Sequence, residues 1–527
     1  MLKRISFILS GIVILILFSI PIFYKFQWNR NAVAIGSDPQ IKYYQTFSLY
    51  QNLSIQNNLQ CYFPAGEIGF SIKTIPIGYP WAFVTKEDTC FFQYPLIMPF
   101  IHALIAKLTH FSLVLYLPIF SFFINFLIVV GIFRILGAND LVSIYLSLSL
   151  QFLTPVFISS VDYSEVTLSN SFFLSAIYLY ERLKVSEWKK SMVFIVLCAF
   201  SIALTFQLRP ESTIAIIILF LIGFLMHIRS FERMRIYFAI GFVFLFITCL
   251  FSYFNYSNYH HVLGMRGWNT LQDTQVLTGK QYLLNWIADL WGSDFKIGVF
   301  KAYPVLAFFM ILPIFFKIQK KKIQFLLAGM IFLFVLPILS PYRAGVDILG
   351  LRYYESGVYL LAIGGLSTIF IETDVISSRR KISIIVIILV SLSYFGYKSN
   401  TRAIKQWSGA AKVSNTFTKK ILELKPDLII HRGLATTYLM GVTYLEIPQI
   451  VMYSQSDWSQ LETILLKNGM KRILYLYWEG NQLVDTEFPR SIWNQFFDIN
   501  FNFEVGRNWN QESIEIIHFK GLLLKSK

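Results

Sequence analysis

The sequence is poor in charge and in cysteine. Only 14% of its 527 residues are charged and only four are cysteines, while hydrophobic residues make up 55%. A soluble domain carries about 25% charged residues, because its surface must face water. The mean hydropathy of +0.55 agrees with this. The composition therefore excludes an ordinary soluble protein and indicates one that lies largely in a membrane.

Long apolar stretches recur along the first three quarters of the chain. Many have roughly 18–22 residues, enough to cross ~30 Å of hydrocarbon as a helix that satisfies its own backbone hydrogen bonds. We predict about eleven spans, at residues 5–25, 112–134, 141–159, 166–181, 191–208, 212–228, 236–254, 302–316, 323–340, 354–371 and 382–397.

The positive charge has a clear distribution. The formal net charge is +16, which in a soluble protein suggests nucleic-acid binding. If the N-terminus is cytoplasmic, the inner segments hold 17 Lys and Arg against 6 Asp and Glu, whereas the outer turn 159–165 holds no Lys or Arg. The inner segments are residues 1–4, 134–140, 181–190, 227–235, 317–322 and 372–381. The excess thus follows the positive-inside rule, and no nucleic-acid partner is predicted.

The long connections all lie on the outer side in this topology. They are residues 26–111 and 255–301, within a transmembrane domain that we assign to residues 1–397, and the tail 398–527. Long ordered loops are seldom kept without a use, so we expect the function at the outer face.

Part of the first outer segment is itself apolar. After Tyr94-Pro95-Leu96 the apolar run ends at Leu108, which is too short for a span. We predict an interfacial or re-entrant helix, and the alternative is a spanning helix that would invert the later topology.

The tail is polar and contains apolar runs of strand length. They lie at residues 427–431, 449–453, 472–477 and 513–519, with a helical stretch at residues 458–467. This alternation predicts a small extracytoplasmic α/β domain. It has no glycine-rich phosphate loop and no metal-ligand spacing, so we expect a structural or acceptor-docking role.

The four cysteines fall into two pairs. Cys61 and Cys90 lie in the first outer segment, where they could form a disulfide or remain apart. Cys198 and Cys249 lie within spans, where a buried apolar role is expected.

Asp38 is the principal candidate for chemistry. It follows the first span in Ile35-Gly36-Ser37-Asp38-Pro39. A carboxylate near the membrane surface can accept a proton from an attacking hydroxyl. The alternative is a turn, because Gly-Ser-Asp-Pro is typical of turns.

A second acidic site is predicted at Asp162 and Glu165 in an outer turn. Acids so close to the hydrocarbon need a partner. Together with Asp38 they could bind a divalent cation, Mg²⁺ or Mn²⁺, or they could simply cap helices.

Three arginines are candidates for binding a phosphate. Arg209 lies in Arg209-Pro210-Glu211 between two spans, while Arg343 and Arg352 lie in the segment before a late span. Guanidinium groups match phosphate oxygens, although pairing with Glu211 or generic headgroup anchoring would also place arginines there.

These motifs together resemble the GT-C superfamily of integral-membrane glycosyltransferases, in particular bacterial ones with a C-terminal periplasmic domain. The resemblance covers nearly the whole membrane region, from Asp38 after the first span to Arg352-Tyr353 at a late one. It implies an α-helical multi-pass membrane protein with a small C-terminal α/β domain, in the bacterial cytoplasmic membrane among membrane lipids.

The resemblance also implies an activity. It is inverting hexosyl or pentosyl transfer from a polyprenyl-phosphate sugar to a glycan, lipid or protein acceptor, with Asp38 as general base. Arg352, and with less support Arg209, would stabilise the departing phosphate. Many relatives carry paired acids where this chain has Asp38-Pro39, which leaves the need for a metal open. The alternatives are a lipid-linked sugar flippase or transporter, a glycan polymerase or ligase, and a non-enzymatic scaffold.

Overall fold

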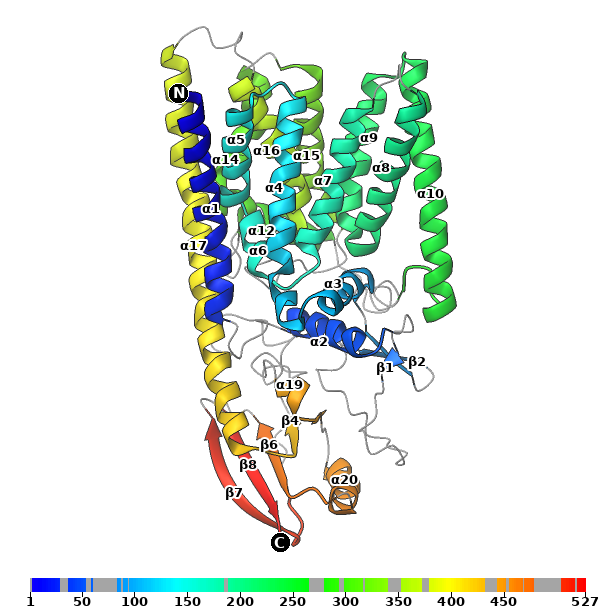
Figure 1. The fold of residues 1–527 in the computed structure, drawn as a ribbon, viewed down its shortest axis with the longest axis vertical. Coiled ribbons are helices and arrows are strands. Elements are labelled where there is room, and N and C mark those ends of the chain that lie inside the picture. The colour runs from blue at the N-terminus through cyan, green and yellow to red at the C-terminus, as the bar shows by residue number, and fades with distance from the viewer. Residues whose placement is uncertain are drawn as a thin grey trace. The chain divides into compact units, whose positions relative to one another are not determined.

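The computed structural model describes most of the chain (Figure 1). The described residues are 2–28, 37–53, 58–59, 83–86, 89–92, 94–183, 188–264, 279–292, 298–315, 318–339, 352–371, 379–431, 443–451, 455–467, 469–477, 504–516 and 519–527. By internal packing the chain divides into unit 1, Met1–Phe23 with Tyr116–Lys405, and unit 2, Tyr24–Leu115 with Gln406–Lys527. The division predicted at residue 398 stays a prediction.

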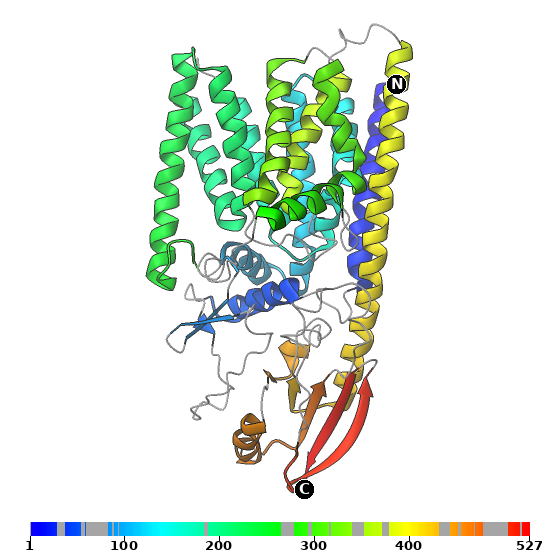
Figure 2. The same cartoon turned by 180° about the vertical axis from the view of Figure 1, so that it is seen from behind.

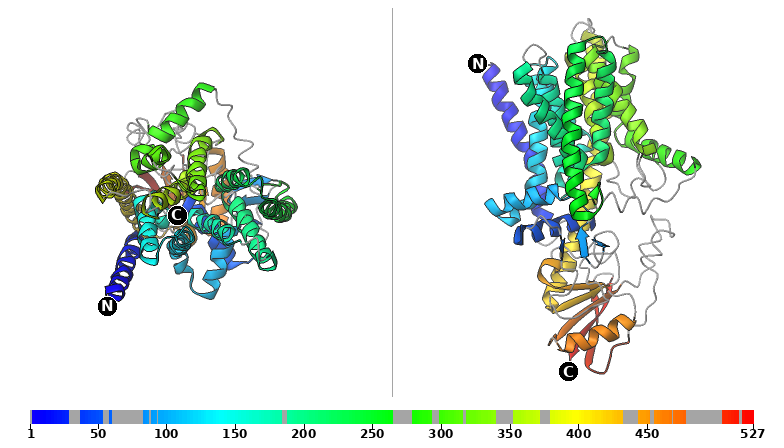
Figure 3. Two further views of the ribbon diagram at one scale, coloured as in Figure 1. Left: turned by 90° about the horizontal axis from the view of Figure 1, so that it is seen from above. Right: turned by 90° about the vertical axis from the view of Figure 1, so that its right-hand side faces the viewer.

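Unit 1 consists of apolar helices that run alongside one another, and the left view of Figure 3 looks along them. They are α1 (Leu2–Trp28, which ends in unit 2), α4 (Leu117–Ile135), α5 (Asp140–Leu153), α6 (Val156–Val161), α7 (Val166–Arg182), α8 (Trp188–Leu208), α9 (Pro210–Met226), α10 (Phe231–Tyr259), α13 (Val299–Ala302), α14 (Pro304–Phe315), α15 (Lys320–Leu339) and α16 (Glu355–Ile371). The helix α12 (Gly279–Trp291) instead runs across the others (Figure 2).

Each predicted span up to 354–371 overlaps one of these helices or a consecutive pair, and the span 382–397 lies within α17 (Arg379–Leu424). Seven described helices are long and apolar enough to cross a membrane, and α5, α9 and α14 are shorter apolar helices. The helix α10 carries the clearest apolar face, with Phe238, Phe242 and Phe246 exposed by 65%, 74% and 60%. Such a face is stable only against lipid. The protein is therefore a multi-pass membrane protein, as predicted.

The cysteines within the spans differ in their surroundings. Cys198 is buried in α8, and its thiol donates to the backbone oxygen of Ala176 at 3.3 Å. Cys249 is exposed on α10, so the burial predicted for it is wrong. The sequence could not distinguish them, because both positions are equally apolar.

The last helix, α17 (Arg379–Leu424), continues well beyond the predicted span 382–397. Its residues after Lys405 belong to unit 2. It ends where Lys425 adopts a left-handed conformation, φ 45°, directly before Pro426. These are ordinary helix-ending signals, and nothing earlier in the polar stretch breaks the helix.

The tail forms a five-stranded sheet in the order β5-β4-β6-β8-β7. Its strands are β4 (Leu428–His431), β5 (Gln449–Val451), β6 (Arg472–Tyr477), β7 (Trp509–Ile516) and β8 (Phe519–Ser526). The strands β5, β4 and β6 are parallel, whereas β8 is antiparallel to β6 and to β7. The α/β prediction is confirmed, but the single strand predicted at residues 513–519 instead covers the end of β7 and the first residue of β8, which pair antiparallel.

Alternate residues of the sheet face two different layers. Leu428 and Tyr475 pack in a cluster with Trp458 of α20 (Gln455–Lys467). Ile429 and Leu474 pack in a second cluster with Phe417 of α17. The alternation of side chains along each strand thus fills both cores.

The first outer segment contains the helices α2 (Ser37–Gln51) and α3 (Ile97–Leu108), a small sheet and a 3₁₀ turn. The sheet has the order β1-β3-β2, formed by Asn58–Leu59, Thr89–Phe92 and Phe83–Lys86. The helix α3 is too short to cross the membrane, in agreement with the interfacial prediction. The rings of Tyr43, Phe47 and Tyr50 on α2 surround Phe111, with centroids 5.0, 5.1 and 5.1 Å away.

His102 gives the packing of α3 a dependence on pH. Its side chain is 2% exposed, and burial lowers its pKa to about 3. An unfolded chain binds a proton at this residue near pH 6.5, so the folded state binds fewer protons between the two values. Stability should therefore fall as the pH decreases from about 6.5 towards 3.

We expect His102→Leu to reduce this loss of stability in acid. The measurement is the unfolding temperature of the detergent-solubilised protein at a series of pH values between 7.5 and 4.5. Wild type should lose more stability on acidification than the variant. Parallel profiles of the two proteins would contradict the role of His102.

Candidate active site

A break between α5 and α6 shapes one side of the candidate site. Pro155 has no backbone N–H, and the preceding Thr154 is extended, as residues before proline usually are. The side-chain amide of Asn400 on α17 donates to the backbone oxygens of Phe152 and Thr154, both at 3.0 Å. The Tyr303 hydroxyl donates to Asn400 Oδ1 at 2.6 Å. These bonds satisfy a broken helix in apolar surroundings, where water cannot.

Glu355, the first residue of α16, lies deep within unit 1 and is 1% exposed. The Ser159 hydroxyl on α6 donates to its Oε1, and the Asn170 amide on α7 donates to its Oε2 at 2.6 Å. The charges of Asp162 and Arg209 also act on this carboxyl group. A buried acid is tolerated only with such partners, so Glu355 connects α6, α7 and α16.

Arg209 connects a further pair of helices. It is the N-cap residue of α9, follows the last residue of α8 and is 2% exposed. Its Nη1 lies 3.5 Å from Glu165 Oε1, and its Nη2 pairs with Glu211. Its Cζ lies 4.7 Å from the centroid of the Tyr353 ring. Carboxylates and a ring face thus compensate the buried cation. This agrees with the alternative drawn from the sequence, in which Arg209 pairs with Glu211.

Arg352 lies at the same ring but is more accessible. Its Cζ is 5.4 Å from the Tyr353 centroid, and its side chain is only half-buried. The next residue in the chain is anchored, because the Tyr354 hydroxyl donates to Asp289 Oδ2 on α12 at 2.7 Å. Of the two arginines, Arg352 is therefore the better placed to reach a ligand.

We call Asp162, Glu165, Arg209, Glu211 and Glu355 the acid–arginine cluster. It holds four carboxyl groups and one guanidinium group, and Arg352 lies beside it at the Tyr353 ring, so there is a formal excess of two acids, 4 − 2. Within the described ranges, no group of three or more His, Cys, Asp or Glu side chains could hold a metal ion. The predicted Mg²⁺ or Mn²⁺ site also includes Asp38, whose side chain lies outside those ranges, so this site stays a prediction.

Asp162 and Glu165 lie between α6 and α7, as predicted, and each is 4% exposed. Glu165 occupies the N-cap position of α7, but its side chain makes no capping hydrogen bond. It is oriented towards Arg209 instead. The interpretation of Glu165 as a simple capping residue is therefore wrong, because the buried guanidinium is the stronger partner.

Asp38 lies in unit 2, in the first turn of α2. Ser37-Asp38-Pro39 thus begins a helix rather than forming an isolated turn, since proline and an acid both suit a first helical turn. The Asp38 side chain, Arg343 and Cys61 lie outside the described residues, as does the side chain of Cys90, whose backbone is in β3. Their predicted roles stay predictions.

Sequence analysis missed Glu355 and Asp289. An acid at the beginning of an apolar span is a recognisable signal for a functional or paired group. The positive end of the helix dipole also favours an acid there, so the position alone does not distinguish the two causes. Ser159 and Asn170 gave no signal, because such residues are frequent between packed membrane helices.

Comparison with solved structures finds a match over nearly the whole chain. The structure of ArnT from Cupriavidus metallidurans bound to undecaprenyl phosphate is similar over 98% of this chain and 98% of its own, with a TM-score of 0.55 at 9% identity. The apo oligosaccharyltransferase of Archaeoglobus fulgidus aligns over 86% of this chain and 69% of its own, with a TM-score of 0.44 at 11% identity. No family model and no curated protein matches the sequence.

The chain therefore has the GT-C fold, as its motifs suggested. The similarity to ArnT extends over both chains almost completely, so it includes the C-terminal sheet as well as the membrane helices. At 9% identity it establishes the architecture, and the chemistry has to be argued from residues of this chain.

We expect Arg209→Gln to destabilise the protein by roughly 3–5 kcal/mol, because it leaves buried carboxylates without their cation. The measurement is unfolding in detergent. The exposed Arg182 on α7, which contacts Tyr178, provides the matched control Arg182→Gln, with an expected effect within about 0.5 kcal/mol.

Glu165→Gln in the Arg209→Gln background should recover part of the loss, since it removes the uncompensated charge. Equal stability of the single variants Arg209→Gln and Arg182→Gln would contradict the structural role of Arg209.

Proposed function

We propose that this protein transfers a sugar from a polyprenyl-phosphate donor to an acceptor hydroxyl at the outer face of the bacterial cytoplasmic membrane. The acceptor is a glycan, a lipid or a protein. Asp38 acts as general base, and Arg352 binds the phosphate of the donor, assisted by Arg209 and Arg343.

The observation that carries this proposal is the full-length similarity to ArnT, whose structure holds undecaprenyl phosphate. A phosphate on a long isoprenoid chain stays at the membrane interface. In unit 1, the accessible Arg352 lies beside the acid–arginine cluster at the ends of several apolar helices. A guanidinium group at such a position suits an interfacial phosphate.

The proposed reaction is a single displacement. The acceptor oxygen forms a bond to the anomeric carbon as the bond from that carbon to the phosphate oxygen breaks, which inverts the configuration. The acceptor proton passes to the Asp38 carboxylate, and the electron pair of the broken bond stays on the lipid phosphate. The first turn of a helix favours the ionised acid that a base requires.

Most of the rate enhancement would come from positioning and charge. The lipid chain holds the donor at the interface, which reduces the search for a productive geometry. A cation near the leaving phosphate stabilises the charge that develops there, and the effect is larger where water is excluded. The buried contacts of Arg209 fix the Tyr353 ring against which Arg352 lies.

The outer face is proposed from the charge distribution. In α7, Glu165 precedes the first residue and Arg182 is the last, while α15 begins with Lys320, Lys321 and Lys322. The acid–arginine cluster thus lies at the end of unit 1 opposite to these lysines. Under the positive-inside rule the lysines are cytoplasmic, and the cluster is outside.

Sugar transfer by the purified full-length protein in lipid bilayers tests the proposal. Polyprenyl-phosphate and polyprenyl-diphosphate sugars are offered as donors, with and without EDTA. We expect transfer from a polyprenyl-phosphate sugar. Asp38→Asn should lower the rate by about 10²–10⁴-fold, because the base is lost. Arg352→Ala should lower it by about a hundredfold, because a charge-stabilising group is lost.

Two exposed residues provide matched controls, Asp140→Asn and Arg182→Ala. Asp140 pairs with Arg134 at the lysine-bearing end of unit 1, so neither change should affect transfer. Undiminished transfer by Asp38→Asn would overturn the assignment of the base. Lipid translocation without transfer from any donor would overturn the proposal in favour of a flippase.

A further inference from the structure

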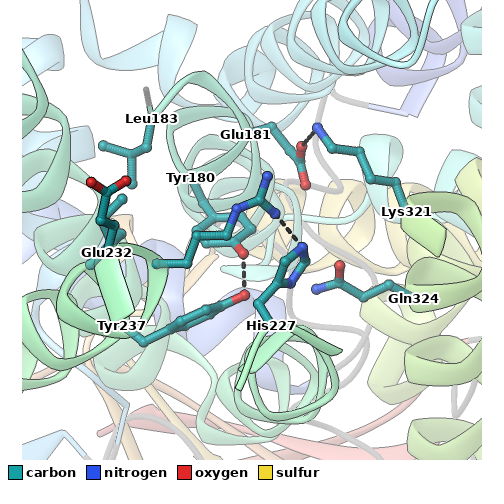
Figure 4. A pocket seen from close by; sticks show the side chains of 10 residues that line it. Tyr180, Glu181, Leu183, His227, Glu232, Tyr237, Lys321 and Gln324 are labelled. Carbon is teal, nitrogen blue, oxygen red and sulfur yellow. Dashed lines mark hydrogen bonds and ion pairs between the residues drawn. The ribbon is translucent and has the colours of Figure 1, made fainter. Parts of the chain in front are cut away.

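A polar cavity lies at the lysine-bearing end of unit 1. Its volume is about 530 Å³, and it is enclosed by the ends of α7 and α9 and the beginnings of α10 and α15 (Figure 4). The residues that the argument uses are Glu181, His227, Glu232, Arg233, Tyr237 and Lys321. The cavity is separated from the acid–arginine cluster by the length of α7, roughly 26 Å.

One ion pair in the cavity is already complete. Lys321 Nζ lies 2.7 Å from Glu181 Oε2 and donates a hydrogen bond to it. The Glu181 side chain is 5% exposed and that of Lys321 49% exposed. Glu181 is therefore neutralised, and the ammonium group retains further N–H donors on its exposed side.

The partner of Arg233 is the imidazole of His227 instead of an acid. His227 Nδ1 lies 2.8 Å from the backbone oxygen of Gly223, so Nδ1 carries the proton and donates. His227 Nε2 then accepts a hydrogen bond from Arg233 Nη1. The guanidinium keeps its full charge, and none of the carboxylates in the described ranges forms an ion pair with it.

Glu232 is the adjacent residue and also lines the cavity. Its side chain is exposed, and no described side chain forms an ion pair or hydrogen bond with it. The cavity thus presents one uncompensated cation, Arg233, and one uncompensated carboxylate, Glu232. When Glu181 and Lys321 are included, the lining holds two basic and two acidic side chains. It is therefore formally neutral, 2 − 2, but its charges are separated.

The wall behind these charges is closely fitted. The hydroxyl groups of Tyr180 and Tyr237 are hydrogen-bonded to each other, and Gln324 donates to the backbone oxygen of Leu219 at 2.9 Å. Tyr237 and Gln324 approach α9 at Gly223, where any side chain would collide with both. The cavity is thus built on a close approach of three helices.

The helix that carries Glu232 and Arg233 also has an exposed apolar face. Glu232 and Arg233 lie in the first turn of α10, and the exposed Phe238 and Phe242 follow about one and a half to three turns later, on the side of the helix away from Arg233. The positive end of the α10 dipole also favours an anionic group beside Arg233.

We propose that this cavity binds the headgroup of a zwitterionic phospholipid that carries a phosphate and a primary ammonium group. The phosphate contacts Arg233 and Lys321, and the ammonium group contacts Glu232. A phosphoethanolamine headgroup has this chemistry. The site is separate from the proposed sugar transfer and does not depend on it.

Related headgroups fit less well for stated reasons. Phosphocholine has no N–H to donate to Glu232. Phosphoglycerol has no cation, so the carboxylate would remain uncompensated near a second negative charge. The cavity should therefore select phosphatidylethanolamine over both phosphatidylcholine and phosphatidylglycerol.

The test is native mass spectrometry of the purified full-length protein in detergent, with each of these three lipids added separately. Wild type should retain phosphatidylethanolamine about tenfold more tightly than the others, because hydrogen bonds between charged groups exceed neutral ones. Equal retention of the three lipids by wild type would overturn the proposal without any variant.

Two variants test the charges separately. Arg233→Gln should lower phosphatidylethanolamine retention about tenfold, and Glu232→Gln should abolish the preference over phosphatidylglycerol. Arg182→Gln, at the same end of α7 but outside the cavity lining, is the matched control and should bind as wild type does. Wild-type retention and selectivity in both cavity variants would overturn the proposal.

A soluble competitor distinguishes the two sources of the headgroup. Free phosphoethanolamine should displace the bound lipid only at a large molar excess, because it lacks the apolar contacts of the acyl chains. Displacement at equal concentration would overturn the membrane lipid as the ligand and assign the cavity to a soluble phosphate.

Discussion

The burial of Arg209 is the constraint on which this end of the membrane unit depends. A guanidinium group removed from water requires carboxylates, and Glu165 and Glu211 provide them from α7 and α9. The same side chain contacts the Tyr353 ring before α16 and acts on Glu355. One residue between two helices therefore fixes four helix ends, and these helix ends form the surface beside Arg352.

The break at Thr154 and Pro155 completes this arrangement. Without it α5 would continue straight, and neither Ser159 nor Asp162 would lie near Glu355. The break is stable because Asn400 satisfies the freed carbonyl oxygens and Tyr303 orients Asn400. Polar residues on α17 and α13–α14 thus position acids that lie far from them in the sequence.

The two ends of unit 1 differ in how deeply their charged side chains are buried and in how they are paired. At the acid–arginine cluster the charges are largely buried, and the ion pairs of Arg209 with Glu165 and Glu211 link α7 to α9, which favours a rigid surface. At the polar cavity the charges remain partly exposed. Among the described residues, neither Glu232 nor Arg233 forms an ion pair with a side chain of opposite charge. Rigid, paired charges are suited to holding a geometry, whereas open, separated charges are suited to binding a ligand.

The sequence by itself determined the membrane helices, the short helix before Leu108 and the α/β character of the tail, and it predicted the sidedness of the basic clusters. Each follows from local hydropathy, charge or periodicity, which neighbouring residues carry together. It also identified Asp162, Glu165 and Arg209 as candidates. Only the tertiary structure decided that Arg209 is a paired, buried group, that Glu355 accepts from Ser159 and Asn170, and that Glu232 and Arg233 share a cavity with Lys321. These outcomes depend on which helices pack together. The sequence of one helix does not show which side chains of another helix will contact it.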